Sequence, residues 1–232
     1  MLILAIDTAL DACAAAVLDT EAGEPVAIES LPMKRGHAEA LMPLIARVMQ
    51  SARLSFAALD RIAVTTGPGS FTGLRVGISA ARGLALAADR PVVGLTTLSA
   101  YAAAIVSQNQ SAPVISAVDA RHDHVYFQIV AGDGSQLVPP MVAGIDEAIA
   151  ASQFGAPHLV GNAARILADR WPKDATPPVA VDAQAAPDIR WIAWLGAAAD
   201  PQTAPARPFY LRAPDAKPAE LPPLAVQAAT PC

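Results

Sequence analysis

The opening of the chain indicates how it folds, beginning with LILAIDTALDACAAAVLD at positions 2–19. The apolar run Leu2–Ile6 predicts a strand that ends at Asp7, and Cys13–Leu18 predicts a second strand shortly after that break. A short turn then leads into a third strand, Val26–Leu31. Connections this short join antiparallel neighbours, so we expect an antiparallel three-stranded meander.

Helices and strands alternate after this meander. Apolar residues at helical spacing predict a helix over His37–Arg53, and Arg61–Thr65 predicts a strand followed by a glycine-rich loop and a second helix. A strand at Pro91–Leu95 and a helix at Thr97–Val106 complete the unit. The order βββαβα recurs in the second half of the chain. We therefore expect an α/β protein with two such lobes, each holding a mixed sheet.

Three regions are predicted along the chain. Residues 1–110 form an N-terminal lobe that carries the partner-binding helices, and residues 111–200 form a C-terminal lobe. Residues 201–232 form a tail that holds eight of the 21 prolines. Proline lacks a backbone donor, so this tail is expected to be extended or disordered.

A duplicated lobe that opens with strand-Asp-Thr is the layout of the actin, hexokinase and heat-shock ATPase superfold. In that fold a nucleotide phosphate sits against the first turn. Here Asp7 and Thr8 occupy the first turn and Asp119 the equivalent second turn. These residues are candidates for binding a nucleotide, ATP or ADP. The alternative is that Asp7 ends a strand and caps a turn, as aspartate often does.

The loop GPGSFTG at positions 67–73 is the most unusual motif of the chain. Its glycines and proline predict an irregular backbone, and it opens a helix whose first amides can bind an anion. Gly67, Gly69 and Ser70 are therefore candidates for a phosphate site. The motif is not a P-loop, because the required lysine is missing. The alternative is tight strand-to-helix packing, with Ser70 or Thr72 as the N-cap.

Two predicted helices carry smooth apolar faces. Glycine inside a helix costs about 0.5–1 kcal/mol relative to alanine, which suggests that another helix approaches closely. That helix belongs either to the same chain or to another subunit, in a four-helix bundle. The predicted interface residues are Leu41, Leu44, Ile45 and Val48 on one helix, and Gly73, Val76, Gly77, Ala80 and Ala81 on the other.

Composition restricts the function classes. The formal net charge is −5, whereas proteins that grip nucleic acid alone are usually basic. The two cysteines, Cys13 and Cys232, give no disulfide framework, which fits a reducing compartment. No apolar stretch reaches the ~20 residues of a membrane span. We expect a cytoplasmic protein that has no membrane contact.

Several segments, in this order, resemble the bacterial TsaB family, and the resemblance covers residues 1 to about 130. They are Leu2–Ala9, His37 before Leu-Met-Pro, Thr66–Gly77, Asp119-Ala-Arg, Val125-Tyr and Tyr210-Leu-Arg.

The resemblance implies a non-catalytic subunit in the synthesis of threonylcarbamoyladenosine in tRNA. TsaB-like proteins are paralogues of TsaD, the transferase, whose metal site uses two histidines four residues apart on a helix. The matching segment here, Thr96–Ala102, contains no histidine. The family's dimer contact implies that helices 37–53 and 72–88 bind a TsaD-like subunit, or a second copy when TsaD is absent. A TsaE-like ATPase is the further partner implied, and tRNA is reached only through the complex.

Two rival functions start from other features. The paired turns at Asp7 and Asp119 suggest a small-molecule kinase or phosphatase. An older peptidase label of the family has no nucleophile–base pair to support it here. The pair His122 and His124 resembles a metal site, but alternate residues of a strand face opposite sides. The sequence therefore predicts no metal centre.

Overall fold

The computed structural model describes residues 1–108, 111–151 and 153–212. Its first unit contains β1 (Leu2–Asp7), β2 (Ala12–Asp19), β3 (Glu24–Pro32), α1 (His37–Ala52), a 3₁₀ turn (Phe56–Ala58), β4 (Arg61–Gly67), α2 (Phe71–Ala88), β5 (Val92–Thr96) and α3 (Thr97–Val106). The second contains β6 (Val114–Arg121), β7 (His124–Val130), β8 (Gln136–Gly144), α4 (Ile145–Ala150), β9 (His158–Val160), α5 (Ala164–Asp169), β10 (Ala180–Asp182) and α6 (Ile189–Ala198).

Two five-stranded sheets share one topology. The first has the order β3-β2-β1-β4-β5, and the second, read from the corresponding edge, has β8-β7-β6-β9-β10. In each sheet the opening three strands are antiparallel, and the two later strands are parallel to the first strand. The predicted duplicated α/β fold with mixed sheets is confirmed, and this is the ATPase-type fold.

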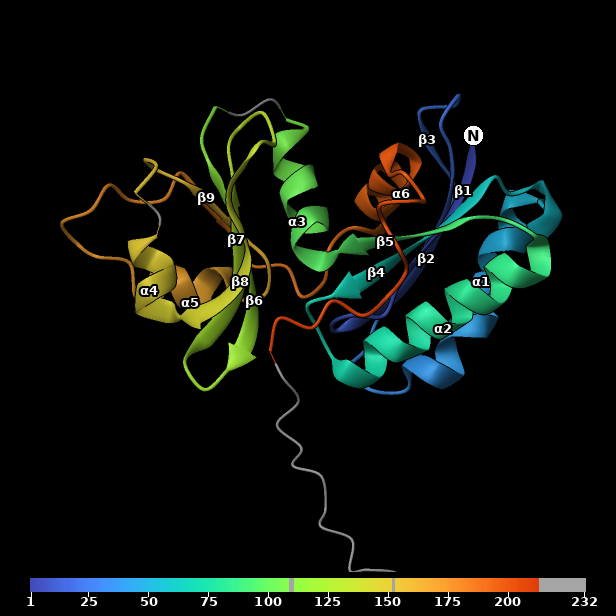
Figure 1. The fold of residues 1–232 in the computed structure, drawn as a ribbon, viewed down its shortest axis with the longest axis horizontal. Coiled ribbons are helices and arrows are strands. Elements are labelled where there is room, and N and C mark those ends of the chain that lie inside the picture. The colour runs from blue at the N-terminus through green and yellow to red at the C-terminus, as the bar shows by residue number, and fades with distance from the viewer. Residues whose placement is uncertain (109–110, 152, 213–232) are drawn as a thin grey trace, which may run out of the picture.

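Helices cover the first sheet on both faces (Figure 1). α1 and α2 lie against one face and contact each other, while α6 packs on the opposite face against β1, β2 and β4. Gly196 of α6 permits this approach, because a Cβ there would lie closer than 3.0 Å to Ala63. The sequence predicts that α6 belongs to the C-terminal lobe. In the structure the chain crosses back to the first unit after β10, and α6 packs into the core of that unit.

Helix α3 lies between the two sheets, contacting β4 and β5 of the first and β6 of the second (Figure 1). Its buried Leu98 and Tyr101 share one apolar cluster with Val114 and Val118 of β6. The Tyr101 hydroxyl donates a hydrogen bond to the Gln184 carbonyl, 2.9 Å away, and so ties α3 to the chain that leaves β10. This helix holds the two units together.

Side-chain N-caps explain where two of the helices begin. Ser70 caps α2 by accepting a hydrogen bond from the Gly73 amide, and Thr96 caps α3 in the same way through Ser99. Helix α1 begins at His37, as predicted, and continues through Pro43 to Ala52.

Residues 201–203 form a turn, and the chain that follows runs beside β5 and the end of β4. The Gly94 amide donates to the Ala204 carbonyl, and the Phe209 amide donates to the Thr66 carbonyl. The prediction for residues 213–232 lies outside the described residues.

Candidate functional site

Asp7 ends β1 and is fully buried. Its Oδ1 accepts hydrogen bonds from the Ala9 amide at 2.9 Å and from the Thr65 hydroxyl at 2.5 Å, whereas its Oδ2 has no hydrogen-bond partner. Burial raises the pKa of this carboxyl, because the charged form is separated from water, and the hydrogen bonds from Thr65 and Ala9 offset only part of that effect. The side chain is part of the core beneath the β1–β2 turn.

The glycine-rich loop closes over this turn. A Cβ at Gly69 would lie closer than 3.0 Å to the Ala9 carbonyl, and a Cβ at Gly73 would lie equally close to the Thr8 carbonyl. The Ser70 amide donates to the Ala9 carbonyl at 2.7 Å, and the Thr8 hydroxyl donates to the Gly73 carbonyl at 2.7 Å. The start of α2 is therefore packed tightly on Thr8 and Ala9, whereas Ala9 also lines an open cleft next to this turn.

The six predicted binding residues divide into two groups. Gly69, Ser70 and Asp119 line a cleft of ≈ 600 Å³ between the two units. Asp7, Thr8 and Gly67 are buried behind it. The structure thus brings the second turn and the glycine-rich loop to one cleft, but it withdraws the Asp-Thr pair of the first turn.

Further polar side chains line the cleft. Arg121 forms an ion pair with Asp119 at 3.8 Å, and the Asn162 amide oxygen accepts a hydrogen bond from the Asp119 backbone amide. Lys34 lies across from them, 4.0 Å from Asp11. Lys34, Arg121 and Asn162 were not predicted as binding residues, because they come from separate segments of the chain and show no common spacing.

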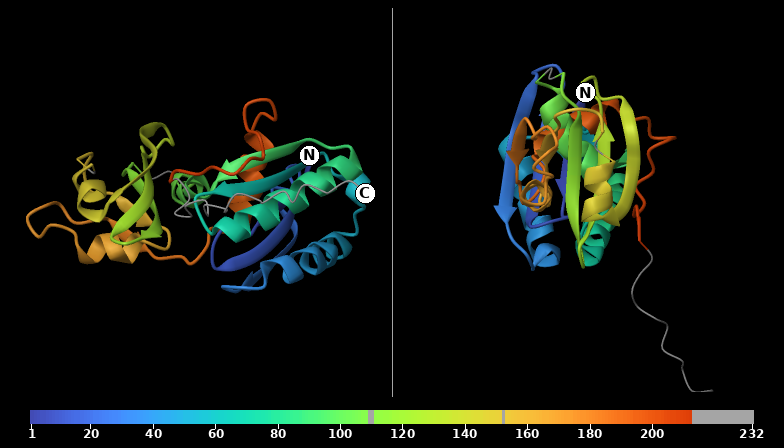
Figure 2. Two further views of the ribbon diagram at one scale, coloured as in Figure 1. Left: turned by 60° about the horizontal axis from the view of Figure 1, so that its bottom comes forward. Right: turned by 90° about the vertical axis from the view of Figure 1, so that its left-hand side faces the viewer.

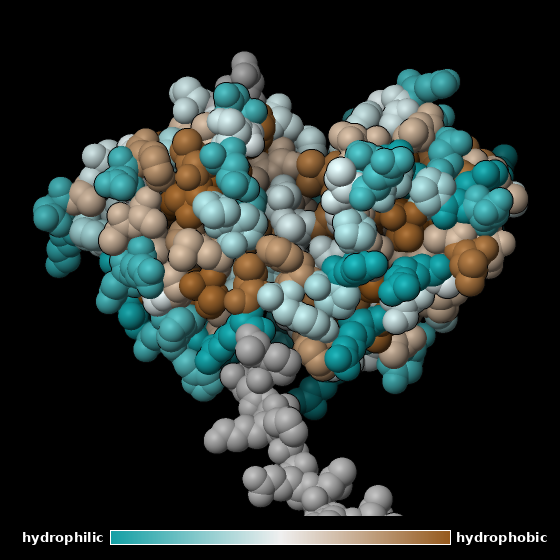
Figure 3. Space-filling view, in the orientation of Figure 1, coloured by the Kyte–Doolittle hydropathy of each residue, from teal (hydrophilic) through white to brown (hydrophobic). Residues whose placement is uncertain are grey.

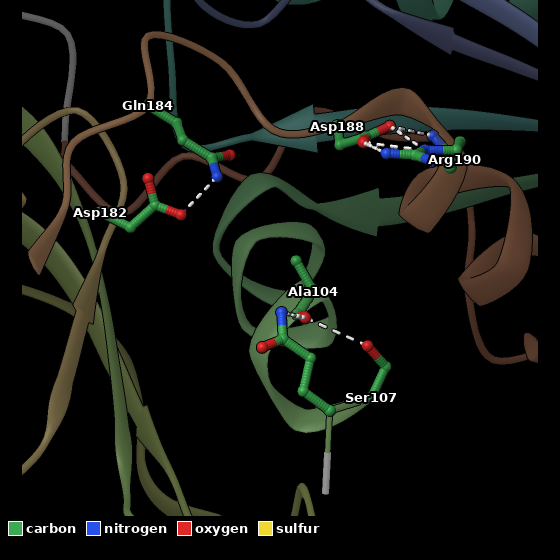
Figure 4. A network of polar contacts seen from close by, with 7 residues as sticks. Ala104, Ser107, Asp182, Gln184, Asp188 and Arg190 are labelled. Atoms are coloured by element: carbon green, nitrogen blue, oxygen red, sulfur yellow. Dashed lines mark hydrogen bonds and ion pairs between the residues drawn. The ribbon is translucent and has the colours of Figure 1, made fainter. Parts of the chain in front are cut away.

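A network of polar contacts holds the chain between β10 and α6 (Figure 4). The Gln184 side-chain amide donates to Asp182 at 2.6 Å, and the Arg190 guanidinium pairs with Asp188 at the start of α6. The Ser107 hydroxyl donates to the Ala104 carbonyl at the end of α3. Gln184 also lines the cleft, and its carbonyl accepts the hydrogen bond from the Tyr101 hydroxyl of α3.

The predicted interface residues require a correction. Leu41, Leu44, Ile45 and Val48 are 0–2% exposed and pack on the first sheet, and Gly73, Gly77 and Ala81 are buried as well. The glycine ridge contacts Thr8 and Val64 of the same chain. Assigning these seven residues to a partner surface was wrong, because they form the core of the lobe. Val76 and Ala80 are half-buried and stay candidates.

The opposite side of the same helices is uncovered. α1 and α2 lie side by side in both views that show them (Figure 1, Figure 2). Met42 is 47% exposed and Leu86 is 86% exposed. We call the exposed side of this helix pair the helix-pair face; it comprises Met42, Ala46, Val76, Ser79, Ala80, Arg82, Gly83 and Leu86.

Metal-ligating side chains do not cluster in the described part of the chain. Over residues 1–108, 111–151 and 153–212, no group of three or more His, Cys, Asp or Glu side chains is placed to hold a metal ion. His122 and His124 are exposed at the β6–β7 hairpin. Burial raises the pKa of the Cys13 thiol to about 11, which keeps it from reacting as a thiolate.

The buried carboxyl of Asp7 makes stability depend on pH. The pKa of this carboxyl is raised in the folded state, so the folded protein binds the proton more tightly than the unfolded chain does. The contribution of Asp7 to the free energy of unfolding is therefore fully present below the unfolded pKa of 3.8 and is lost as the pH rises through the folded pKa. We expect Asp7→Asn to become steadily more stable relative to the wild type as the pH is raised from 4 to 7, measured by urea unfolding.

Asp133→Asn is a control of opposite sign. Hydrogen bonds from Ser135 lower the pKa of the exposed Asp133 carboxyl, so the wild type gains over this variant as the pH rises. A stability difference for Asp7→Asn that does not change with pH would mean that Asp7 is not shielded from water.

The family is shown by comparison with known proteins. Residues 31–177 match the family model described as TsaD, tRNA N6-adenosine threonylcarbamoyltransferase. A protein of Mycobacterium tuberculosis described as uncharacterized is 33% identical over 93% of this chain and 94% of its own length. The chain belongs to this TsaD family.

Among its relatives are proteins named TsaB. The protein named tRNA threonylcarbamoyladenosine biosynthesis protein TsaB is 40% identical in Haemophilus influenzae and 37% in Escherichia coli, each over 55% of this chain. The chain spans about half the length of these curated relatives, 53% and 54%.

Solved structures agree with this placement. A Pseudomonas aeruginosa protein described as similar to peptidase YEAZ superposes with a TM-score of 0.76 at 28% identity, over 91% of this chain and 99% of its own. A second structure, YeaZ from Pseudomonas aeruginosa, gives 0.75 at 28% identity, over 90% and 99% of the two chains. Within the part of this chain that the structure describes, no helix has both the length and the apolar character to cross a bilayer.

Proposed function

We propose that this chain is a non-catalytic subunit in the synthesis of threonylcarbamoyladenosine in tRNA, and that it binds and activates a TsaD-like transferase through the helix-pair face. The TsaB names of its relatives support the process. The TsaE-like ATPase remains the further partner that we expect, and a cytoplasmic location follows from this role.

The observation that carries the non-catalytic role is the closed β1–β2 turn. A phosphate at this turn would need the loop amides and the Asp7 carboxylate to face the cleft. Instead the Ser70 amide is bound to Ala9, and Asp7 is fully buried. The absence of a histidine pair at Thr96–Ala102 supports the same role. Nucleotide binding stays a proposal for the cleft lined by Gly69, Ser70 and Asp119, without the Asp7 carboxyl that a kinase or phosphatase of this fold would use.

The helix-pair face has the properties of a binding surface. Leu86 and Met42 expose apolar side chains that a partner can cover, while Gly83 leaves open space beside them. The helices beneath are held by a fully buried apolar side, so they present a rigid surface. Rigid helices bind with little loss of conformational freedom.

The test measures the affinity of a purified TsaD-like subunit for this chain and for its double variant Met42→Glu/Leu86→Glu. Both side chains are exposed, so the fold should tolerate the change, whereas a Gly77→Leu variant would test packing against Thr8. We expect at least a ~10-fold loss of affinity, since burying unpaired carboxylates costs well over 1.4 kcal/mol. The matched control is Val179→Glu, at a 57% exposed valine near β10. Wild-type capture by the double variant would refute the proposed surface.

A further inference from the structure

An exposed aromatic stack lies at the start of α2. The rings of Phe71 and Tyr210 are stacked with centroids 5.4 Å apart, and the Arg75 guanidinium lies 3.8 Å from the Phe71 ring centroid. Despite these contacts Phe71 is 43% exposed and Tyr210 is 45% exposed. Large aromatic side chains that are ordered yet open to solvent mark a binding surface. The exposed parts of the two rings belong neither to the helix-pair face nor to the lining of the cleft.

The stack continues into the interlobe cleft. Phe71 directly follows Ser70, which lines the cleft together with Lys34 and Arg121. In Figure 1 the start of α2, the β6–β7 hairpin and the last described residues all lie along the lower edge of the molecule. Figure 3 shows hydrophilic side chains gathered along the same edge.

This edge has a positive charge on an acidic protein. Four cationic residues belong to it: Lys34, Arg35, Arg75 and Arg121. Three carboxylates lie among them, Asp11, Glu39 and Asp119, and two of these pair with Lys34 and Arg121. The local excess is one positive charge, whereas the chain as a whole carries −5. We call these seven residues, with Phe71 and Tyr210, the basic edge.

We propose that the basic edge binds an unpaired stretch of RNA, contributing directly to tRNA binding in the assembled complex. An open aromatic ring stacks on any unpaired base, and neighbouring arginines meet the phosphates. Side-chain amides of Asn162 and Gln184 in the adjoining cleft can donate to base edges or phosphates. This inference rests on the proposed function, and it replaces the expectation that the chain reaches tRNA only indirectly.

Charge and shape favour RNA here over a protein partner. The apolar surface suited to a protein lies on the helix-pair face, at Met42 and Leu86. The basic edge instead combines cations, polar cleft groups and stacked rings. The acidic remainder of the chain explains why the edge would act within a complex, because a net negative protein repels RNA elsewhere on its surface.

The test measures binding of a fluorescently labelled anticodon stem-loop RNA to the full chain together with the TsaD-like subunit. Tyr210→Ala is expected to weaken RNA binding by roughly 5- to 100-fold, the loss of one base stack. Tyr210→Phe should bind within about 2-fold of wild type, because the ring remains. Arg75→Gln should also lower the slope of log K against log salt by about 0.7, the value for one phosphate contact on a single strand.

The control and the contrary outcomes separate this inference from the proposed function. Arg53→Gln removes an exposed cation at the other end of α1 and should leave RNA binding unchanged. Capture of the TsaD-like subunit is scored in parallel for every variant. If Tyr210→Ala and Arg75→Gln bind RNA like Arg53→Gln, the inference is overturned, and it is equally overturned if they reduce capture alone. If the wild-type chain and the TsaD-like subunit fail to assemble, the proposed function fails. The RNA contact is then tested by 4-thiouridine crosslinking of the RNA to this chain alone. The inference predicts a crosslink with the wild type that is lost in Tyr210→Ala.

Discussion

Gly73→Ala is expected to lower the free energy of unfolding by about 2–3 kcal/mol, as overpacking of a rigid site does. The added Cβ would lie closer than 3.0 Å to the Thr8 carbonyl, a backbone atom that cannot rotate away. The same two residues are already joined by the hydrogen bond from the Thr8 hydroxyl to the Gly73 carbonyl. The substitution therefore forces the start of α2 away from the β1–β2 turn.

Gly83→Ala is the matched control on the same helix. Nothing lies within 4 Å of a Cβ at Gly83, which is exposed. Alanine there should stabilise the protein by about 0.5–1 kcal/mol through helix propensity. Urea unfolding of both variants gives the comparison. Equal stability of the two would show that the turn is not closed by α2, and the argument for a non-catalytic role would lose its structural basis.

Much of the fold was predictable from local pattern. The apolar runs and the short turns after Ile6 and Leu18 gave the meander, and helical spacing gave α1, α2 and α3. The duplication was also predictable, because the same order of elements recurs. These features depend on neighbouring residues, and sequence reports such information directly.

Features that depend on distant contacts were not predictable. An aliphatic stripe at helical spacing looks the same whether it faces a sheet or a partner, so Leu41 and Ile45 were assigned to the wrong surface. The return of α6 to the first sheet depends on the fit of Gly196 against Ala63, which no local pattern reveals. Tight packing of the loop at Gly69 was one of two alternatives that the sequence left open, and the folded structure shows it.

The candidate site was predicted in part. Gly69, Ser70 and Asp119 do meet in one cleft, as the ATPase-type layout implies. Tyr210 lies in a segment of the family resemblance, but its stacking partner Phe71 lies 139 positions earlier. Exposed side chains such as Met42, Leu86 and Arg75 carry no periodic signal, because surface positions accept most residue types. Their grouping appears once the chain is folded.

The loss of activation by Met42→Glu/Leu86→Glu is the functional effect that we expect to be largest. The TsaD-like subunit would no longer be held in its active arrangement, although the variant keeps the buried core of α1 and α2 intact. Thermal unfolding should show melting temperatures near that of the wild type. Val179→Glu, with an equal kind of change on the second unit, should activate normally.

The direct measurement is the rate of threonylcarbamoyladenosine formation on tRNA by the purified TsaD-like subunit, with its other components, as wild-type or variant chain is added. The account predicts strong stimulation by the wild type and by Val179→Glu, at least a ~10-fold weaker effect from the double variant at equal concentration, and no product from this chain alone. Full stimulation by the double variant, or product formed without the TsaD-like subunit, would contradict it.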